Sequence, residues 1–124
     1  IISLAIYLRG GLIMHANIQE TKEIEILKNC LVTTLNPAKI YLFGSFAEGN
    51  QKQDSDFDFY VIMHNNTNER MLSLTTKAYK AINNLRTRAV DIIVNKENRF
   101  DSRKDLSLTL ENEVAKKGVL VYGE

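Results

Sequence analysis

Apolar residues recur along this chain with two different periods, one typical of helices and one typical of strands. Between Ile18 and Leu35 the spacing is helical, and one face carries the apolar residues Ile24, Leu27, Leu31 and Leu35. The pair Asn36-Pro37 should end this helix, because proline disfavours the α conformation in the residue before it. The pattern therefore predicts a helix over 18–35 with one buried side.

Two further helical stripes follow in the second half of the chain. One predicts a helix over 69–85, with Thr67 or Asn68 as its cap. The other predicts a helix over 102–117, capped by Ser102 and ended by Gly118. Gly44-Ser45 forms a turn, and Ser45 is a candidate N-cap for a short helix.

Short apolar runs rich in β-forming residues lie between these helices and predict four strands. They cover 39–43, 56–62, 89–94 and 119–122, which gives the order α-β-α-β-α-β-α-β. No repeat or low-complexity segment interrupts this order. We expect one α/β (α+β) domain with a small mixed β-sheet flanked by helices.

Composition narrows the class of protein only a little. The chain has 124 residues, 44% hydrophobic and 25% charged, and these values are ordinary for one globular domain. Its net charge of +1 gives no reason to expect binding to duplex nucleic acid or to an anionic membrane. The single cysteine, Cys30, cannot form an intrachain disulfide, and we interpret it as a small core residue of a cytoplasmic protein.

The beginning of the chain has a different character. Residues 1–13 are apolar and then broken by Arg9-Gly10-Gly11, and the first methionine is Met14. The apolar run is much shorter than the roughly 20 residues that a spanning helix needs, and it lacks the features of a signal peptide. We expect residues 1–13 to be a non-native or over-extended segment and residues 14–124 to form the domain.

The chemistry begins with a pair of acids. Asp56 and Asp58 alternate with Phe57 and Phe59 on the predicted strand, so the acids share one face and the phenylalanines share the other. If the phenylalanines pack against helices, the carboxylates point into a cleft and can converge on shared divalent metal. Hard oxygen ligands favour Mg²⁺ or Mn²⁺.

Two further features belong to the same hypothesis. Gly44-Ser45 lies at a strand-to-helix turn, where backbone N–H groups can hold phosphate oxygens and glycine permits close approach. Asp91 lies inside an apolar strand, where an ionised carboxylate needs a partner. That partner is either an arginine, Arg86 or Arg88, or the same metal site as Asp56 and Asp58.

Other polar residues are interpreted as surface groups. Asp54 does not begin an EF-hand loop, because the glycine and glutamate that such a loop requires are absent, so we expect a solvated loop residue. His15 and His64 have no spaced partners for zinc or a nucleophilic triad. The surface cations Lys52, Lys77, Arg86 and Arg88 are each expected to be solvated.

Together, Gly44-Ser45, Ala47-Glu48-Gly49, Ser55-Asp56-Phe57-Asp58 and the later Asp91 resemble the minimal nucleotidyltransferase (MNT) domains of the DNA polymerase β superfamily. The resemblance covers about residues 18–122. It implies the nucleotidyltransferase fold and transfer of a nucleoside monophosphate from an NTP. It also implies that Asp56, Asp58 and Asp91 are catalytic residues that bind metal, and that Gly44 and Ser45 contact the triphosphate. One departure is Glu48, where members often carry a basic residue.

Short members of this type resemble antitoxins paired with HEPN-domain RNase toxins, which they neutralise by transferring AMP to a tyrosine or by forming a complex. The resemblance therefore implies ATP as donor, Mg²⁺ or Mn²⁺ as cofactor, and a HEPN toxin as partner. Two alternatives stay open: a small-molecule nucleotidyltransferase of the aminoglycoside type, whose acceptor pocket would need a homo-oligomer, and a non-catalytic MNT module that neutralises its partner by contact.

Overall fold

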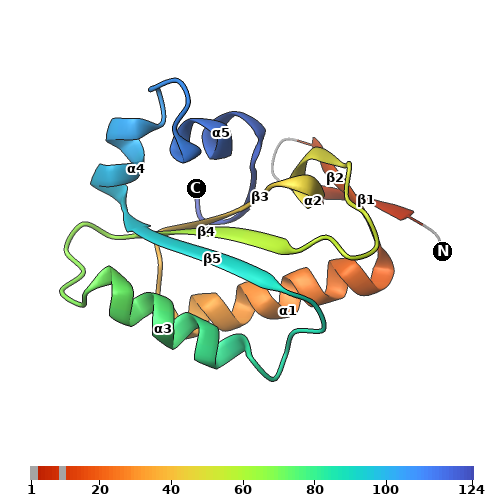
Figure 1. The fold of residues 1–124 in the computed structure, drawn as a ribbon, viewed down its shortest axis with the longest axis horizontal. Helices are drawn as coiled ribbons and strands as arrows, with labels where there is room; N and C mark the ends of the chain where they lie inside the picture. Colours follow the sequence, from red (N-terminus) through yellow and green to blue (C-terminus); the bar gives the residue numbers. More distant parts are fainter. Residues whose placement is uncertain (1–2, 9–10) are drawn as a thin grey trace.

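The structure is a computed structural model that describes residues 3–8 and 11–124, with side chains from Ala16 onwards. Its centre is a mixed four-stranded sheet in the order β5-β4-β3-β6 (Figure 1). The strands are β3 (Lys39–Phe43), β4 (Phe57–Met63), β5 (Val90–Lys96) and β6 (Val119–Tyr122). β3 runs antiparallel to β4 and β6, whereas β4 and β5 are parallel. The expected mixed sheet flanked by helices is thus confirmed.

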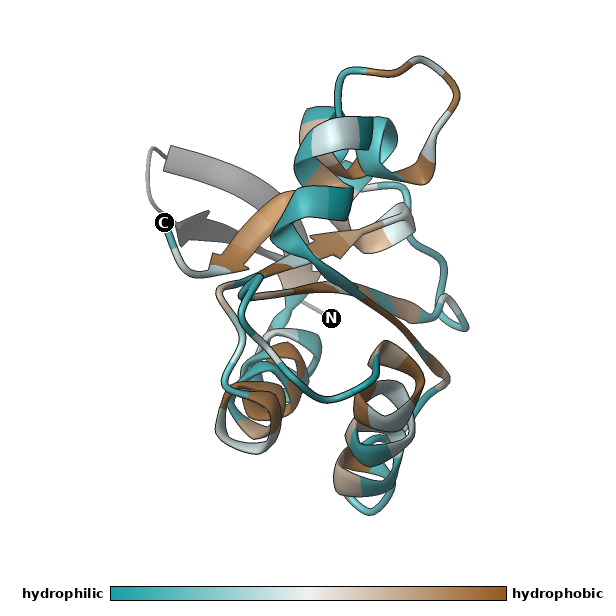
Figure 2. Ribbon diagram, turned by 90° about the vertical axis from the view of Figure 1, so that its left-hand side faces the viewer, coloured by the Kyte–Doolittle hydropathy of each residue, from teal (hydrophilic) through white to brown (hydrophobic). Residues whose placement is uncertain are grey.

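Two helices cover one face of the sheet. α1 (Ile18–Leu35) and α3 (Met71–Ile82) lie side by side beneath the strands (Figures 1 and 2). α1 begins at a capping box in which the Asn17 side chain accepts from the Glu20 N–H and Glu20 accepts from the Asn17 N–H. It ends at Asn36, whose left-handed backbone (φ 51°) precedes Pro37. The predicted bounds and the four predicted buried residues of this helix are confirmed.

The main core lies between these helices and the sheet. Its strand contribution includes Phe57, Phe59 and Val61, all fully buried, as the alternation on β4 predicts. Cys30 is half-buried against this core, and its Sγ lies 3.6 Å from the Ala81 carbonyl oxygen. Figure 2 shows the apolar strands between the two helical layers.

The opposite face is covered by two short helices instead of the single predicted helix over 102–117. They are α4 (Glu97–Arg103) and α5 (Leu110–Lys117). Ser102 lies inside α4, and the cap of α5 is Thr109, whose hydroxyl accepts from the Asn112 N–H at 3.0 Å. The spacing of Leu106 and Leu110 predicts one continuous helix, but Leu106 is exposed and Leu108 has a positive φ (68°), which no α-helix accommodates. The start of α5 is therefore set by the Thr109 cap and not by the spacing of the leucines.

Several other predicted boundaries need correction. α3 begins at Met71 and ends at Ile82, so Leu85 is outside it, and its cap residue Arg70 forms no side-chain cap bond. Neither Thr67 nor Asn68 caps it. Ser45 is the first residue of α2 (Ser45–Glu48), and Gly44 occupies the cap position.

Gly118 does end α5, but for a different reason from the one predicted. Its backbone is extended (φ −73°) instead of left-handed. A Cβ atom at this position would lie 2.4 Å from the Val114 carbonyl oxygen. Glycine is needed here because backbone approaches backbone closely.

The beginning of the chain forms an antiparallel hairpin that the sequence pattern did not predict. Its strands are β1 (Ser3–Leu8) and β2 (Gly11–Asn17), and β2 leads directly into α1. The expectation that residues 1–13 are non-native includes residues 1–2 and 9–10, which lie outside the described residues, and it stays a prediction. Across the described ranges, no helix combines the length and apolar character needed to cross a membrane.

Candidate functional site

Three acids and a glycine turn meet at one end of the two parallel strands. Asp58 on β4 and Asp91 on β5 are register partners, and the Phe57 N–H donates to the Ala89 carbonyl (3.1 Å) directly before them. Phe57 and Phe59 are fully buried on the other face of β4, so Asp58 projects away from the main core. The tertiary fold thus brings the late acid, Asp91, beside Asp58, and Asp56 is close enough for its charge to act on Asp58.

The electrostatic state of Asp58 reflects this crowding. Partial burial, the neighbouring Asp91 carboxyl and the charge of Asp56 together raise the pKa of Asp58 to about 6. Side-chain hydrogen bonding to Asp91 contributes to the same rise. A carboxyl that faces other carboxylates without a cation is held partly protonated near neutral pH.

Gly44, the residue directly after β3, lies beside Asp58 and borders the candidate site. Phe43, the residue before it, is the register partner of Asp58, so the turn lies directly beside the acids. Gly44 has φ 74° and ψ −153°, a conformation that residues with a side chain rarely adopt. A Cβ atom there would lie 2.3 Å from Asp58 Oδ2. Glycine therefore satisfies the turn and leaves room for the Asp58 carboxylate, which lies where a side chain at this position would begin.

The donor set fits a divalent cation that shares its coordination with a phosphate. Among the described residues, no three His, Cys, Asp or Glu side chains are already grouped as a ligand set. Mg²⁺ does not require one, because it is usually held by one or two carboxylates, several waters and substrate phosphates. The adjacent Asp58 and Asp91 carboxylates supply that number of protein ligands.

The other polar residues of the prediction have mixed outcomes. Asp54 is exposed on its loop, as expected. His64 lies 3.7 Å from Glu97, and Lys77 pairs with Glu69 at 3.0 Å. The side chain of His15 lies outside the described residues. The expectation of a solvated Arg88 is wrong, because its side chain is 20% exposed and pairs with Glu20, not with Asp91.

Sequence reasoning missed a buried polar network on the same face of the sheet as Asp58. The Tyr60 hydroxyl donates to Glu111 Oε2 (2.7 Å) and accepts from Asn95 (3.1 Å), while Arg103 Nε donates to Glu111 Oε1 (2.9 Å). Glu111 is buried, which raises its pKa, but the hydrogen bonds from Tyr60 and Arg103 outweigh this and the pKa lies below its ordinary value. No sequence signal links Tyr60 to Glu111 across 51 positions.

Solved structures similar to this chain share its fold. One, from Sulfolobus solfataricus and provisionally assigned as a nucleotidyltransferase, has a TM-score of 0.56 and 18% identity, covering 86% of this chain and 83% of its own. A toxin–antitoxin structure with AMP-PNP has a TM-score of 0.50 and 26% identity, covering 82% and 73%. A mutant of the toxin–antitoxin MntA–HpeT has a TM-score of 0.49 and 24% identity over the same shares.

Comparison at the sequence level gives a family. No curated protein sequence matches the chain significantly. The profile of the family described as "Polymerase beta, Nucleotidyltransferase" matches residues 25–124, which include every candidate site residue named above. The chain therefore belongs to the polymerase beta nucleotidyltransferase family.

Proposed function

We propose that this protein is a metal-dependent nucleotidyltransferase that transfers AMP from ATP to a hydroxyl acceptor. The proposed acceptor is a tyrosine of a HEPN-domain RNase toxin, so that the protein acts as an antitoxin. The catalytic and metal-binding residues of the proposal are Asp56, Asp58 and Asp91, and the residues that contact the triphosphate are Gly44 and Ser45.

The observation that carries the proposal is the pairing of Asp58 with Asp91 beside the Gly44 turn. Two carboxylates at one register position repel each other and raise the pKa of Asp58. A structural role would supply hydrogen-bond donors, as Glu111 receives from Tyr60 and Arg103. The uncompensated charge instead favours a ligand that brings positive charge into the site.

Each residue then has a physical role. Asp56 and Asp58 would hold a divalent cation, with Asp91 completing the site from the adjacent strand. The cation, when bound, supplies charge neutralisation for the phosphates during transfer. Asp91, the most exposed of the three acids, is placed to orient the acceptor hydroxyl and take its proton. The N–H groups after Gly44 would hold phosphate oxygens, and the missing side chain lets them approach.

The choice of nucleotide and partner rests on similarity. The relative at 26% identity is a toxin–antitoxin structure with AMP-PNP, an ATP analogue, which supports an adenine nucleotide and a toxin partner for this chain. The HEPN class of the toxin rests on the resemblance of the motif set to HEPN-paired MNT domains. The donor and acceptor are therefore tested separately.

The first test concerns the site itself. Calorimetric titration of ATP is carried out with Mg²⁺, with EDTA, and with the double variant Asp56→Asn/Asp58→Asn. We expect binding that requires Mg²⁺ and is abolished in the double variant, because both carboxylates that hold the cation are neutralised. Asp54→Asn, on the same loop but exposed, is the matched control and should bind as the wild type does. Binding that survives both EDTA and the double substitution would contradict the proposed site.

The second test concerns the acceptor. The protein is incubated with α-labelled ATP and either a purified HEPN toxin or a panel of aminoglycosides. Label on a toxin tyrosine supports the antitoxin proposal, and label on a small molecule supports the alternative. A double variant that still neutralises the toxin would show that contact alone is sufficient.

A further inference from the structure

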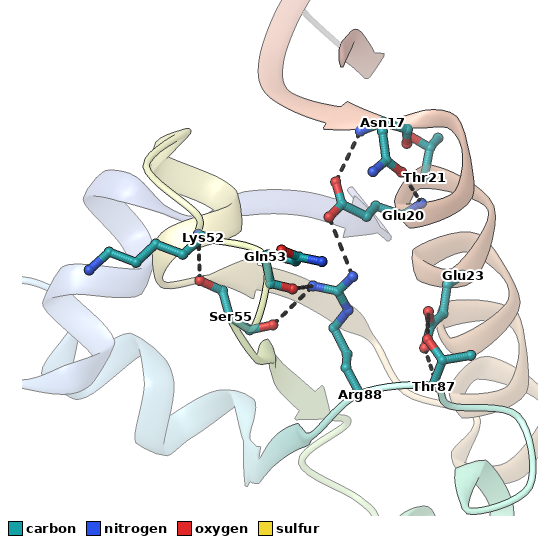
Figure 3. Close-up of polar contacts among 9 residues, drawn as sticks. All are labelled: Asn17, Glu20, Thr21, Glu23, Lys52, Gln53, Ser55, Thr87 and Arg88. Carbon is teal, nitrogen blue, oxygen red and sulfur yellow. Dashed lines mark hydrogen bonds and ion pairs between the residues drawn. The ribbon is translucent and has the colours of Figure 1, made fainter. Parts of the chain in front are cut away.

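We propose that Arg88 is a positioning residue that fixes the backbone leading into Asp56 and joins it to the Gly44 turn. The inference deepens the proposed function and rests on it. Arg88 lies in the segment before β5 and contacts three separate parts of the chain (Figure 3). None of its contacts is with a candidate metal ligand, so any effect on the site would be indirect.

The first contact is with the loop before Asp56. Residues 50–56 form no helix or strand, so the backbone of the loop lacks the support of a regular element. Arg88 Nη1 donates to the Ser55 carbonyl oxygen at 3.1 Å and lies 3.5 Å from the Gln53 carbonyl oxygen. The Ser55 carbonyl belongs to the peptide bond that joins Ser55 to Asp56. Arg88 therefore fixes the peptide plane immediately before the first acid of the site.

The loop has a tight turn that presents this carbonyl. The Ser55 N–H donates to the Lys52 carbonyl at 3.1 Å, and the Lys52 N–H donates to Ser55 Oγ at 2.8 Å. These bonds close residues 52–55 on themselves but do not attach the turn to the rest of the protein. Figure 3 shows Arg88 reaching from the opposite side to make that attachment.

The second contact is with two buried rings. The Arg88 Cζ atom lies 5.1 Å from the Phe46 ring centroid and 4.8 Å from that of Phe57, distances at which a guanidinium is attracted to an aromatic face. The two rings also pack on each other, with centroids 4.7 Å apart. Phe46 belongs to α2, directly after Ser45, and Phe57 is the first residue of β4, between Asp56 at the end of the loop and Asp58 on the strand. Arg88 thus packs on the contact between α2, which follows Gly44-Ser45, and the start of β4, which carries Asp58.

The third contact fixes the guanidinium itself. Arg88 Nη2 lies 3.4 Å from Glu20 Oε2, and the two side chains are only 20% and 12% exposed. Glu20 is held in turn by the Asn17 N–H at the start of α1 (3.0 Å). Arg88 Nε is buried and meets no hydrogen-bond partner among the described residues, so the group is held through its two terminal nitrogens and the rings.

These contacts require arginine. A planar guanidinium can donate in two directions while its face lies against aromatic rings, whereas the ammonium of lysine is a point charge without a planar face. Lysine would retain the charge opposite Glu20 but lose the simultaneous bond to Ser55 and the stacking. Groups that orient metal ligands indirectly typically change metal affinity or activity by about 10–100-fold when they are removed.

The test compares Arg88→Lys and Arg88→Gln with the wild type and with Thr87→Ala. Thr87 is the matched control, because its hydroxyl (2.6 Å) and its N–H (2.7 Å) both bond Glu23 of α1, whereas the neighbouring Arg88 bonds the loop. Three quantities are measured: the affinity for Mn²⁺·ATP, the hydrogen-exchange rates of the Lys52, Ser55 and Phe57 amides, and the melting temperature. A merely structural residue would change only the melting temperature.

We expect both Arg88 variants to bind Mn²⁺·ATP about 10-fold more weakly and to exchange the amides of Lys52 and Ser55 in the loop, and of Phe57 at the start of β4, faster. Thr87→Ala should retain wild-type affinity and loop exchange. The inference is overturned if folded Arg88→Gln binds within about twofold of the wild type, or if loop exchange is unchanged, against the effect expected for such groups. If the Arg88 variants do not fold, Glu20→Gln decides, because it keeps an acceptor for the Asn17 N–H while removing the charge that holds Arg88.

The two proposals can fail separately. If the wild type binds no Mn²⁺·ATP under any condition, the proposed function fails. The exchange rates of the loop amides then decide the role of Arg88 alone: faster exchange in Arg88→Gln supports the anchoring of the loop, and unchanged exchange overturns it.

Discussion

Asp58 and Glu111 lie on the same side of the sheet, but the protein surrounds them in opposite ways. Asp58 faces Asp91, with Asp56 nearby, and its pKa is raised to about 6 by burial and by these acids. Glu111 is more deeply buried, but it accepts hydrogen bonds from Tyr60 (2.7 Å) and Arg103 (2.9 Å), and its pKa is lowered despite the burial. Burial alone therefore does not explain the difference; the neighbours do.

The contrast separates a structural carboxylate from a functional one. Glu111 is satisfied by the fold, and it also orders Tyr60, whose pKa is raised by burial and by its bond to Glu111. Asp58 has no such donor among the causes of its shift, and the acids beside it destabilise its charged form. Charge that the fold leaves unbalanced marks the place where a cationic ligand would be stabilising.

The largest expected effect on stability and nucleotide binding comes from substitution of Gly44, beside Asp58. Gly44→Ala introduces a Cβ atom 2.3 Å from Asp58 Oδ2 at a backbone conformation that alanine resists. We expect a loss of about 1–3 kcal/mol in the free energy of unfolding together with loss of Mg²⁺-dependent ATP binding, because the carboxylate must move. Denaturant unfolding and calorimetry measure the two quantities.

The control for that substitution is Gly49→Ala. Gly49 also has a positive φ (78°), but a Cβ atom there meets nothing within 4 Å. It should cost about 1–2 kcal/mol from the left-handed backbone and leave nucleotide binding unchanged. Equal loss of binding in both variants would show that general weakening of α2, not the space beside Asp58, is responsible.

The next largest effect on stability is expected at Glu111, the carboxylate to which the fold supplies hydrogen-bond donors. Glu111→Gln keeps the shape of the side chain but removes its charge, which weakens the hydrogen bonds from Tyr60 and Arg103. We expect a loss of about 1–2 kcal/mol in unfolding free energy with no change in the affinity for Mg²⁺·ATP. Glu113→Gln, an exposed position on the same helix, should be nearly neutral. If Glu111→Gln abolished Mg²⁺·ATP binding without changing the free energy of unfolding, the hydrogen bonds among Tyr60, Glu111 and Arg103 would be part of the nucleotide-binding site.

The smallest effect is a pair of pH dependences with opposite signs. The pKa of Glu111 is lowered in the folded protein, so its contribution to stability is present above the ordinary glutamate pKa and is lost as pH falls. The pKa of Asp58 is raised, so in the metal-free protein its contribution is greatest at low pH and declines as pH rises towards 6. Unfolding free energies measured from pH 3 to about 7 for the wild type, Glu111→Gln and Asp58→Asn separate the two.

The cause of the raised pKa of Asp58 can be tested directly by substituting Asp91. Asp91→Asn removes the charge that repels the Asp58 carboxylate, so the Asp58 carboxyl should titrate at a lower pH than the value of about 6 in the wild type. Carbon-detected NMR of the side-chain carboxyl measures this. A titration midpoint that does not move would mean that burial, not Asp91, controls Asp58.

Local patterns predicted much of this protein correctly. The helix over 18–35 follows from its apolar stripe and from Asn36-Pro37, and its observed bounds agree. The strands over 39–43 and 119–122 likewise match. The prediction failed over 102–117 because a leucine spacing of four continued through a break that the Thr109 cap imposes. It also missed the pairing of β1 with β2, because the break at Arg9-Gly10-Gly11 was interpreted as the end of a non-native segment and not as the turn between two strands.

The sequence by itself determined which residues are available for chemistry: the alternation of Asp58 with Phe57 and Phe59 on β4 separates a charged face from a buried one, since successive strand side chains point to opposite sides. Asp56, predicted to be the first residue of this strand, is instead the last residue of the loop before it. Only the tertiary structure decided which of those residues meet. The parallel pairing of β4 and β5 places Asp91 beside Asp58. The contacts of Arg88 with Glu20 of α1 and with the Ser55 carbonyl oxygen hold its guanidinium beside the peptide bond before Asp56. Such contacts join residues 33 and 68 positions apart, and their geometry depends on sheet register and helix packing, which no local pattern encodes.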